Sequence, residues 1–167
     1  MATISLYVDG SCDHQRQNIH AGVVVCQRKK SIIESKTVLN TSNHLDGFEI
    51  LAVISGLNIA KQMEDINSIN IYSDHLSLIS ILQEGCDKLK VSSMYQKHKP
   101  LMHKLYLSIK HFESLKINLN FKHLSFRDSS KMRRADELSK LWKNKQRKQG
   151  KFCGFLRLKY KQPLDCK

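Results

Sequence analysis

The sequence predicts an α/β protein built on one five-stranded mixed sheet flanked by helices. Five apolar segments rich in β-branched and aromatic residues have the length of strands. The first three follow one another closely, whereas helical segments precede the fourth and the fifth. Closely spaced strands pair antiparallel, and a strand reached through a helix joins by a crossover and lies parallel. We therefore expect three antiparallel strands followed by two strands parallel to the first.

The predicted order is strand, strand, strand, helix, strand, helix, helix, strand, helix. The expected strands cover residues 3–8, 20–27, 31–39, 66–73 and 117–125. The expected helices cover residues 47–62, 75–85, 100–115 and a last segment that begins near residue 131.

Apolar spacing and end signals support each helix. The first has one apolar stripe at spacings of three and four, made by Ile50, Val53, Ile54, Leu57 and Ala60. Gly85 ends the second helix, and Pro100 is a favoured first-turn residue for the third. The last helix has an inward face of Leu138, Leu141 and Trp142.

Composition limits the class of protein. A chain of 167 residues with 41% hydrophobic content is long enough for one domain with a proper core. Its formal net charge of +13 favours a polyanionic partner, either nucleic acid or an anionic membrane surface. No apolar run approaches the ~20 residues that span a bilayer, and no signal segment is seen. We expect a soluble, intracellular, cytoplasmic protein with no membrane partner.

The five cysteines are scattered along the chain. They form no CxxC pair and no cluster with histidine, so neither a disulfide framework nor a structural zinc site is predicted. This distribution favours a reducing compartment.

The charge is concentrated at the end of the chain. Residues 143–167 contain nine Lys or Arg and one acid, which supplies +8 of the total. A charge run is usually a solvated tail, but aromatic and leucine side chains alternate with these charges. Both a folded-back appendage and a nucleic-acid-binding arm fit this pattern. We divide the chain into a domain of residues 1–142 and a basic C-terminal extension of residues 143–167.

Two acids end predicted strands. Asp9 follows the first strand and Asp74 the fourth, and the carboxyl ends of parallel strands are where ligands bind in such sheets. Neighbouring parallel strands would place these side chains at one edge. Two carboxylates that close repel, so one takes up a proton unless a cation lies between them. A divalent ion is the natural counter-charge.

Two further acids are expected near helix starts. Glu49 opens the first helix and Asp136 the last, and four converging carboxylates can hold two hard cations. Each acid also has a structural explanation: a hairpin turn at Asp9 and Gly10, a helix cap at Asp74, or a favourable helix-dipole position. The ordered set of four favours the metal site.

Four segments, in order, resemble the type 1 ribonuclease H family. They are "YVDGSC", "FEILAVISGL", "IYSDHLSLISIL" and "RRADELSK", the last resembling a closing Asp-Glu-Leu-Ala. The resemblance covers about residues 3–141. It implies the ribonuclease H-like mixed sheet described above, with a catalytic domain in residues 1–142.

The resemblance also implies a reaction. Asp9, Glu49, Asp74 and Asp136 would bind two Mg²⁺ or Mn²⁺ ions that activate water and stabilise the departing 3′ oxygen. The substrate implied is the RNA strand of an RNA·DNA hybrid, cut to leave 5′-phosphate and 3′-hydroxyl and recognised by groove shape and 2′-hydroxyls. We expect a monomer.

Substrate and product contacts depart from the family pattern. The matching substrate-binding positions are Gly10, Ser11, Asn43 and His75, although Asn43 lies six residues before Glu49 and His75 replaces a serine. In bacterial relatives, the loop before the last acid often carries a histidine that helps product release. Arg127 is placed more like the arginine that replaces this histidine in some archaeal-type relatives, whereas His123 ends the fifth strand. We therefore favour Arg127 over His123 for that catalytic role, since an isolated histidine is also poor evidence of function.

Two other functions remain open at this point. One is a catalytically weak ribonuclease H-like module that binds nucleic acid through its basic surface. The other is a different nuclease of the same superfamily, of the resolvase or exonuclease type. Converging acids argue against the binding module, because a phosphate-binding surface gains nothing from negative charge unless metal offsets it.

Overall fold

The sheet has the predicted five strands in the predicted mixed arrangement. The computed structural model describes residues 2–28, 30–40 and 47–141. The strands lie in the order β3-β2-β1-β4-β5. Their bounds are Ala2–Asp13 for β1, Asn18–Gln27 for β2, Lys30–Asn40 for β3, Ile66–Ser73 for β4 and Asn118–His123 for β5. The pairs β1–β2 and β2–β3 are antiparallel, whereas β1–β4 and β4–β5 are parallel.

The helices agree with the prediction except in one segment. Their bounds are Phe48–Ala60 for α1, Leu76–Gln83 for α2, Cys86–Val91 for α3, Ser93–Lys97 for α4, Lys99–Ser114 for α5 and Ser130–Ser139 for α6. The short helices α3 and α4 were not predicted, because neither is long enough to show a helical period. Ser92 separates them, since its backbone is extended and its hydroxyl accepts a hydrogen bond from the Tyr95 N–H.

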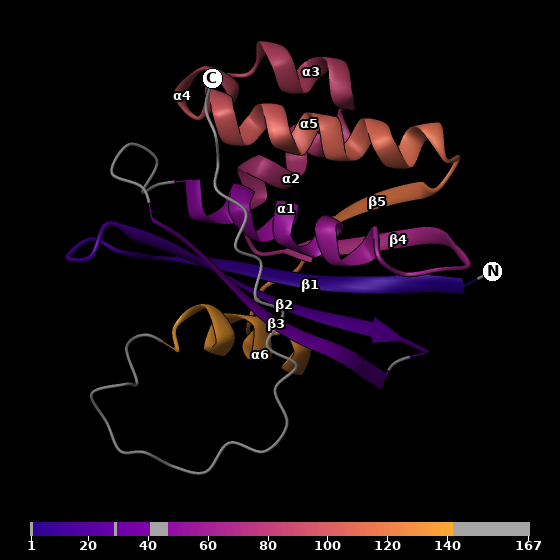
Figure 1. Cartoon of the computed structure of the whole chain (residues 1–167), viewed down its shortest axis with the longest axis horizontal. Coiled ribbons are helices and arrows are strands. Elements are labelled where there is room, and N and C mark those ends of the chain that lie inside the picture. Colours follow the sequence, from indigo (N-terminus) through magenta and orange to yellow (C-terminus); the bar gives the residue numbers. More distant parts are fainter. Residues whose placement is uncertain (1, 29, 41–46, 142–167) are drawn as a thin grey trace.

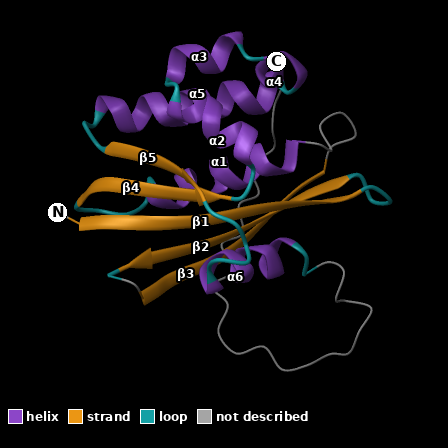
Figure 2. Cartoon of the chain, turned by 180° about the vertical axis from the view of Figure 1, so that it is seen from behind, coloured by secondary structure: helices purple, strands orange, loops and turns teal. Residues whose placement is uncertain are grey.

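The helices cover the two faces of the sheet unequally. Figure 1 shows α1 to α5 on one side of the sheet and α6 alone on the other. The view from behind in Figure 2 agrees, and α6 packs mainly against β2 and β1. On β1, Ile4, Leu6 and Val8 face the larger helical layer and are completely buried. This alternation follows from the period of two along a strand.

Helix α1 is buried on almost every side. The sequence predicts a single apolar stripe, but every residue from Glu49 to Leu57 is buried. The reason is that α1 packs against β1 and β2 on one side and against α5 on the other. Its Gly56 lies directly over the sheet, where a Cβ would be 3.0 Å from Val8 Cγ1. A central helix of this kind fixes its first turn firmly relative to the strands.

Helix α6 packs very closely on the opposite face. Ala135 and Leu138 contact Val24 and Cys26 of β2 in a small second core. A Cβ at Gly22 would overlap the Ala135 carbonyl oxygen and lie 2.7 Å from the Ser139 backbone nitrogen. Only glycine therefore permits this approach of helix to strand. The predicted inward residue Trp142 and the extension 143–167 lie outside the described residues.

Among the described residues, no helix is long and apolar enough to cross a membrane.

Replacing Gly22 with alanine is expected to destabilise the protein by about 2 kcal/mol or more, because the added methyl meets backbone atoms that cannot move away independently. Urea unfolding followed by circular dichroism measures this. The matched control is Gly56→Ala, whose methyl meets movable side chains and gains helix propensity, so its change should stay within about 1 kcal/mol. Equal losses in both variants would contradict the close packing described for α6.

Candidate active site

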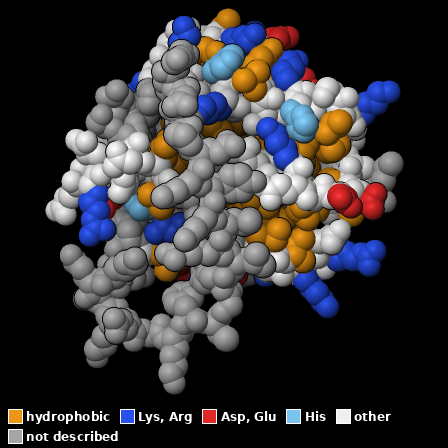
Figure 3. All heavy atoms as spheres, in the orientation of Figure 1, with side chains coloured by type: hydrophobic (Ala, Val, Ile, Leu, Met, Phe, Trp, Pro, Cys, Tyr) orange, Lys and Arg blue, Asp and Glu red, His pale blue; other side chains and the backbone are white. Residues whose placement is uncertain are grey.

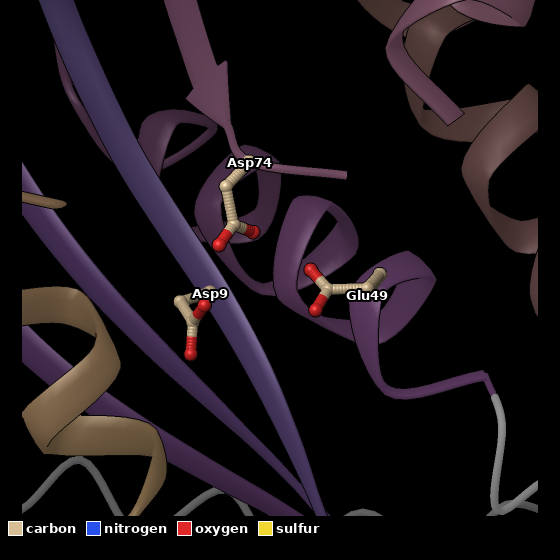
Figure 4. A group of neighbouring side chains, drawn as sticks. All are labelled: Asp9, Glu49 and Asp74. Atoms are coloured by element: carbon tan, nitrogen blue, oxygen red, sulfur yellow. The ribbon is translucent and has the colours of Figure 1, made fainter. Parts of the chain in front are cut away.

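Three carboxylates from three separate elements meet at one corner of the sheet. Asp9 lies on β1, Glu49 in the first turn of α1, and Asp74 directly after β4. One ligand oxygen from each lies within 4.8 Å of the others. Figure 4 shows Glu49 and Asp74 pointing toward β1, where Asp9 lies. Acids far apart in the sequence thus share one small space.

Asp9 is held within a strand and not at a strand end. Pairing of β1 with β2 continues past it, through Gly10↔Ala21 to Asp13↔Asn18. The alternative hairpin turn at Asp9 and Gly10 is therefore wrong. The parallel pairing with β4, however, stops at Tyr7↔Tyr72. Asp9 lies just beyond the point where β4 leaves β1, and the residue is 4% exposed.

A glycine brings Glu49 to the strand. A Cβ at Gly10 would lie 2.5 Å from the carbonyl carbon of Phe48 and 2.8 Å from the Glu49 nitrogen, so the start of α1 touches β1 directly. The Gly10 backbone N–H donates a hydrogen bond to the Glu49 carboxylate. The other oxygen, Glu49 Oε2, is buried and has no hydrogen-bond partner among the residues that the structure describes. A buried oxygen in this state is costly unless something binds it.

The residue after Asp74, and not Asp74 itself, caps helix α2. The N-cap of α2 is His75, whose Nδ1 accepts a hydrogen bond of 3.1 Å from the Leu78 N–H. Asp74 is therefore not the helix cap considered above. His123, at the end of β5, lies against the same residue, with Nε2 3.1 Å from the Asp74 backbone oxygen.

Asp136 occupies a different position from the one predicted. Helix α6 begins at Ser130, capped by the Ser129 hydroxyl, so Asp136 lies in its second half and not near its start. It does not belong to the group of three, and its carboxylate forms an ion pair with Lys140, four residues on. It nevertheless lies near enough to raise the pKa of Asp9.

Burial and mutual repulsion disfavour the charged forms of these acids. Burial raises the pKa of Asp9 to about 7; the Ser139 hydrogen bond opposes this, while Asp74 and Asp136 add to it. Burial also raises the pKa of Glu49 well above its ordinary value, and Asp9 and Asp74 raise it further. Such a cluster needs protons or a cation.

Two of the other predicted site residues differ in their surroundings. Ser11 is buried, and its hydroxyl donates to the Ser139 carbonyl at 2.7 Å. His75 lines a cavity of about 350 Å³ beside Glu49, together with Ser93, Met94, Lys97 and His98. Asn43 lies outside the described residues.

Arg127 lies in the exposed loop after β5, where its guanidinium is 5.6 Å from the Phe126 ring centroid. His123 thus contacts Asp74, whereas the contact described for Arg127 is with the Phe126 ring. The catalytic role of Arg127 stays a prediction.

The acid-cornered mixed sheet agrees with a family-wide sequence pattern. The RNase H family model matches residues 1–143. The chain belongs to the RNase H family. A search of curated proteins gave no match.

Solved RNase H structures have the same fold. The N-terminal RNase H domain of Rv2228c from Mycobacterium tuberculosis is 17% identical, with a TM-score of 0.63 over 87% of this chain and 99% of that chain. RNase H1 from the archaeon Halobacterium salinarum is 14% identical, with a TM-score of 0.63 over 85% and 98%. LC11-RNase H1 in complex with an RNA/DNA hybrid is 21% identical, with a TM-score of 0.60 over 81% and 92%. These likenesses concern the fold.

The carboxylates suit the divalent metals that this RNase H family typically uses. Hard cations prefer oxygen ligands, and three are supplied within 4.8 Å. The unpartnered Glu49 Oε2 and the raised pKa values of Asp9 and Glu49 are what a metal site shows without its cation. The residues present therefore fit a divalent ion.

Sequence reasoning did not identify two residues of this corner. The Ser139 hydroxyl donates to Asp9 Oδ2 at 2.7 Å, and the Lys140 ammonium pairs with Asp136. Both follow Asp136 within four residues, in the last turn of α6 and its cap. Their one sequence signal is this proximity, because the i,i+4 spacing places Lys140 beside Asp136 on the same side of a helix.

Without metal, the free energy of unfolding is expected to fall as pH rises from about 4 to about 7. The pKa of Asp9 is about 7 in the folded chain and near 3.8 when unfolded, so the folded state binds more protons across that range. Urea unfolding in EDTA at about pH 5 and about pH 8 measures the loss. Asp9→Asn should lose less stability than the unsubstituted chain. An equal loss in the two proteins would contradict the raised pKa.

Removing the Lys140 charge is expected to tighten divalent-metal binding. In Lys140→Gln the acids lose a neighbouring cation, which should raise Mn²⁺ affinity by about fivefold, or roughly 1 kcal/mol at a solvated site. Calorimetric titration with MnCl₂ measures it. Lys110→Gln, which changes net charge equally but breaks a pair with Glu113 on α5, is the control. Unchanged affinity in Lys140→Gln would mean that the lysine lies too far from the metal ligands to matter.

Proposed function

We propose that this RNase H protein is a metal-dependent endoribonuclease that hydrolyses the RNA strand of RNA·DNA hybrids by a two-metal-ion mechanism. The products would carry 5′-phosphate and 3′-hydroxyl ends. The observation that supports this most directly is the convergence of Asp9, Glu49 and Asp74 within 4.8 Å, with Glu49 Oε2 buried and unpartnered. A protein that only binds phosphates would be weakened by such a cluster.

The proposed ligands are the three clustered acids together with Asp136. Mg²⁺ or Mn²⁺ bound there would supply the activation of water and the charge compensation that phosphodiester hydrolysis requires. Asp136 would join this set when its carboxylate leaves the Lys140 ammonium and binds the metal instead. Gly10 contributes by orienting Glu49 through its backbone N–H.

Positive charge around the site supports a nucleic-acid substrate. The segment of α3 to α5 carries six lysines and two acids between residues 86 and 114. Figure 3 shows Lys and Arg side chains spread over this helical layer. Lys97 lines the cavity that also contains Glu49 and His75, so a cation lies on the side of the acids where a phosphate backbone would need one. The solved complex of LC11-RNase H1 with an RNA/DNA hybrid supports a hybrid as the substrate class.

His123 at the end of β5 and Arg127 in the loop after it are supported by different observations as the residue that assists product release. His123 Nε2 lies 3.1 Å from the Asp74 backbone oxygen, which places a titratable group beside a proposed metal ligand. Arg127 has the better match to the family pattern but is exposed in the loop. We retain Arg127 as the predicted residue for product release and take His123 as the alternative.

We also propose that residues 1–142 act as the catalytic unit, as a monomer. The family match ends at residue 143, where the basic extension begins. The extension would add sequence-independent attraction to the nucleic-acid backbone through its nine Lys and Arg residues.

The purified chain is expected to cleave the RNA strand of a labelled RNA·DNA hybrid with Mg²⁺ or Mn²⁺, and not in EDTA. Asp9→Asn and Asp74→Asn should each lower the rate by about 100-fold or more, since each removes a charged ligand from the cluster. Gel analysis of the products gives both the rate and the end groups.

The controls separate catalysis from folding and from binding. Duplex DNA and duplex RNA of the same sequence should stay intact, and circular dichroism should show both variants folded. Hybrid binding without cleavage in either metal would contradict the proposal and favour the binding module. Preferential cleavage of a DNA junction or a DNA end would favour the resolvase or exonuclease alternative.

A further inference from the structure

The hydroxyl of Ser139 is a buried hydrogen-bond donor whose shorter contact is to Asp9; its other contact, at 2.9 Å, is to the Asp136 carbonyl oxygen of its own helix. Ser139 is completely buried, and its Oγ lies 2.7 Å from Asp9 Oδ2. The contact joins residues 130 positions apart, one on α6 and the other on β1. It brings a neutral donor from the opposite layer of the molecule to the carboxylate cluster.

The backbone of Ser139 is fixed from two sides. Its carbonyl oxygen accepts a hydrogen bond of 2.7 Å from the buried Ser11 hydroxyl of β1. Its backbone nitrogen lies where a Cβ on Gly22 of β2 would be only 2.7 Å away. Both strands of the β1–β2 pair thus hold this turn of α6, so the hydroxyl is presented to Asp9 from a rigid base.

The hydrogen bond holds the carboxylate that belongs to the acidic cluster. Oδ2 of Asp9 accepts from Ser139, and Asp9 also supplies a ligand oxygen within 4.8 Å of ligand oxygens from Glu49 and Asp74. A carboxylate held by one oxygen cannot rotate freely about its terminal bond. The donor is neutral, so it orients the carboxylate without repelling an incoming cation.

An alanine at this position could not provide this contact. The closing motif that the chain resembles reads Asp-Glu-Leu-Ala, and here it reads Asp136, Glu137, Leu138, Ser139. The side chain that differs is the one that reaches Asp9. Loss of the hydroxyl also removes only one atom from a closely packed site, so Ser139→Ala tests the contact with little disturbance of packing.

We propose that Ser139 is a positioning residue that fixes the carboxylate of Asp9 for divalent-metal binding. This rests on the proposed function, in which Asp9 is a metal ligand. Ser139 contacts the ligand and not the metal or the substrate. The class of ligand served by the contact is a hard divalent cation bound through oxygen.

The test uses the full chain and Mn²⁺ alone, in the absence of nucleic acid. Titration calorimetry with MnCl₂ is expected to give an affinity about tenfold lower for Ser139→Ala than for the unsubstituted chain, as for other residues that orient metal ligands. In hybrid cleavage at limiting Mn²⁺, kcat should fall while KM for the hybrid changes little. Ser139→Cys, which keeps a weak donor of similar size, should lie between the two in Mn²⁺ affinity and serves if the alanine variant does not fold.

Ser11→Ala is the matched structural control. It removes the other buried hydroxyl contact between β1 and the last turn of α6 but leaves the donor to Asp9 in place. We expect a loss of stability similar to that of Ser139→Ala, measured by urea unfolding, but a clearly smaller loss of Mn²⁺ affinity, because Ser11 supports the Ser139 backbone and leaves the Ser139 hydroxyl beside Asp9. Equal losses of Mn²⁺ affinity in the two variants would mean that Ser139 acts only through packing.

The remaining outcomes separate this proposal from the proposed function. Unchanged Mn²⁺ affinity in a folded Ser139→Ala would overturn the positioning role alone, whatever the chain cleaves. Failure of the unsubstituted chain to bind Mn²⁺ would overturn both the metal site and the positioning role. Normal Mn²⁺ binding with a tenfold loss in Ser139→Ala, but no hybrid cleavage, would support the positioning role and overturn the proposed substrate.

Discussion

The repulsion among buried carboxylates is the constraint on which the rest of this structure depends. Asp9 and Glu49 are both buried, and burial together with their neighbours raises the pKa of each. A fold would not keep such a group together for its own stability, because charged groups without partners are costly inside a protein. The surrounding elements must therefore be rigid enough to hold it. The buried helix α1, the close contact at Gly10 and the tightly packed α6 meet this requirement.

The corner contains several groups that moderate this repulsion. The Gly10 N–H donates to Glu49, the Ser139 hydroxyl to Asp9, and the Lys140 ammonium pairs with Asp136. These contacts do not reach every oxygen, since Glu49 Oε2 stays unpartnered. The chain itself thus neutralises this corner only in part, as a proposed cation site requires. Catalytic sites commonly combine stability loss with function in this way.

Much of this arrangement could be predicted from the sequence, and the exceptions have physical reasons. Strand order and direction follow from connection type, and the predicted pairing of β1 with β4 is confirmed. Asp9, Glu49 and Asp74 were predicted to converge, and their side chains do lie together. The end of β1 was placed too early, because Asp-Gly is a common turn signal and the pairing beyond it depends on β2. The start of α6 agrees with the prediction to within one residue, but Asp136, which was expected near that start, lies in the second half of the helix.

The contacts of Ser139 and Lys140 could not be predicted in the same way. A serine hydroxyl reaches a carboxylate on another layer only when the distance between helix and strand is right, and that distance is set by Gly22. No local pattern encodes such a distance. The same holds for His123, whose position beside Asp74 results from the parallel pairing Ser73↔His123.

The long antiparallel pairing of β1 with β2 separates the chemistry from the turn that joins the strands. Ten residue pairs run from Ile4↔Gln27 to Asp13↔Asn18, with five before Asp9↔Gly22 and four after it. The position of Asp9 opposite Gly22 is set by this ladder of pairs and not by the turn at residues 14–17. The turn can therefore change in length or composition over evolutionary time while Asp9 keeps its position. Relatives that differ greatly in this turn can still place the acid at the same corner of the sheet.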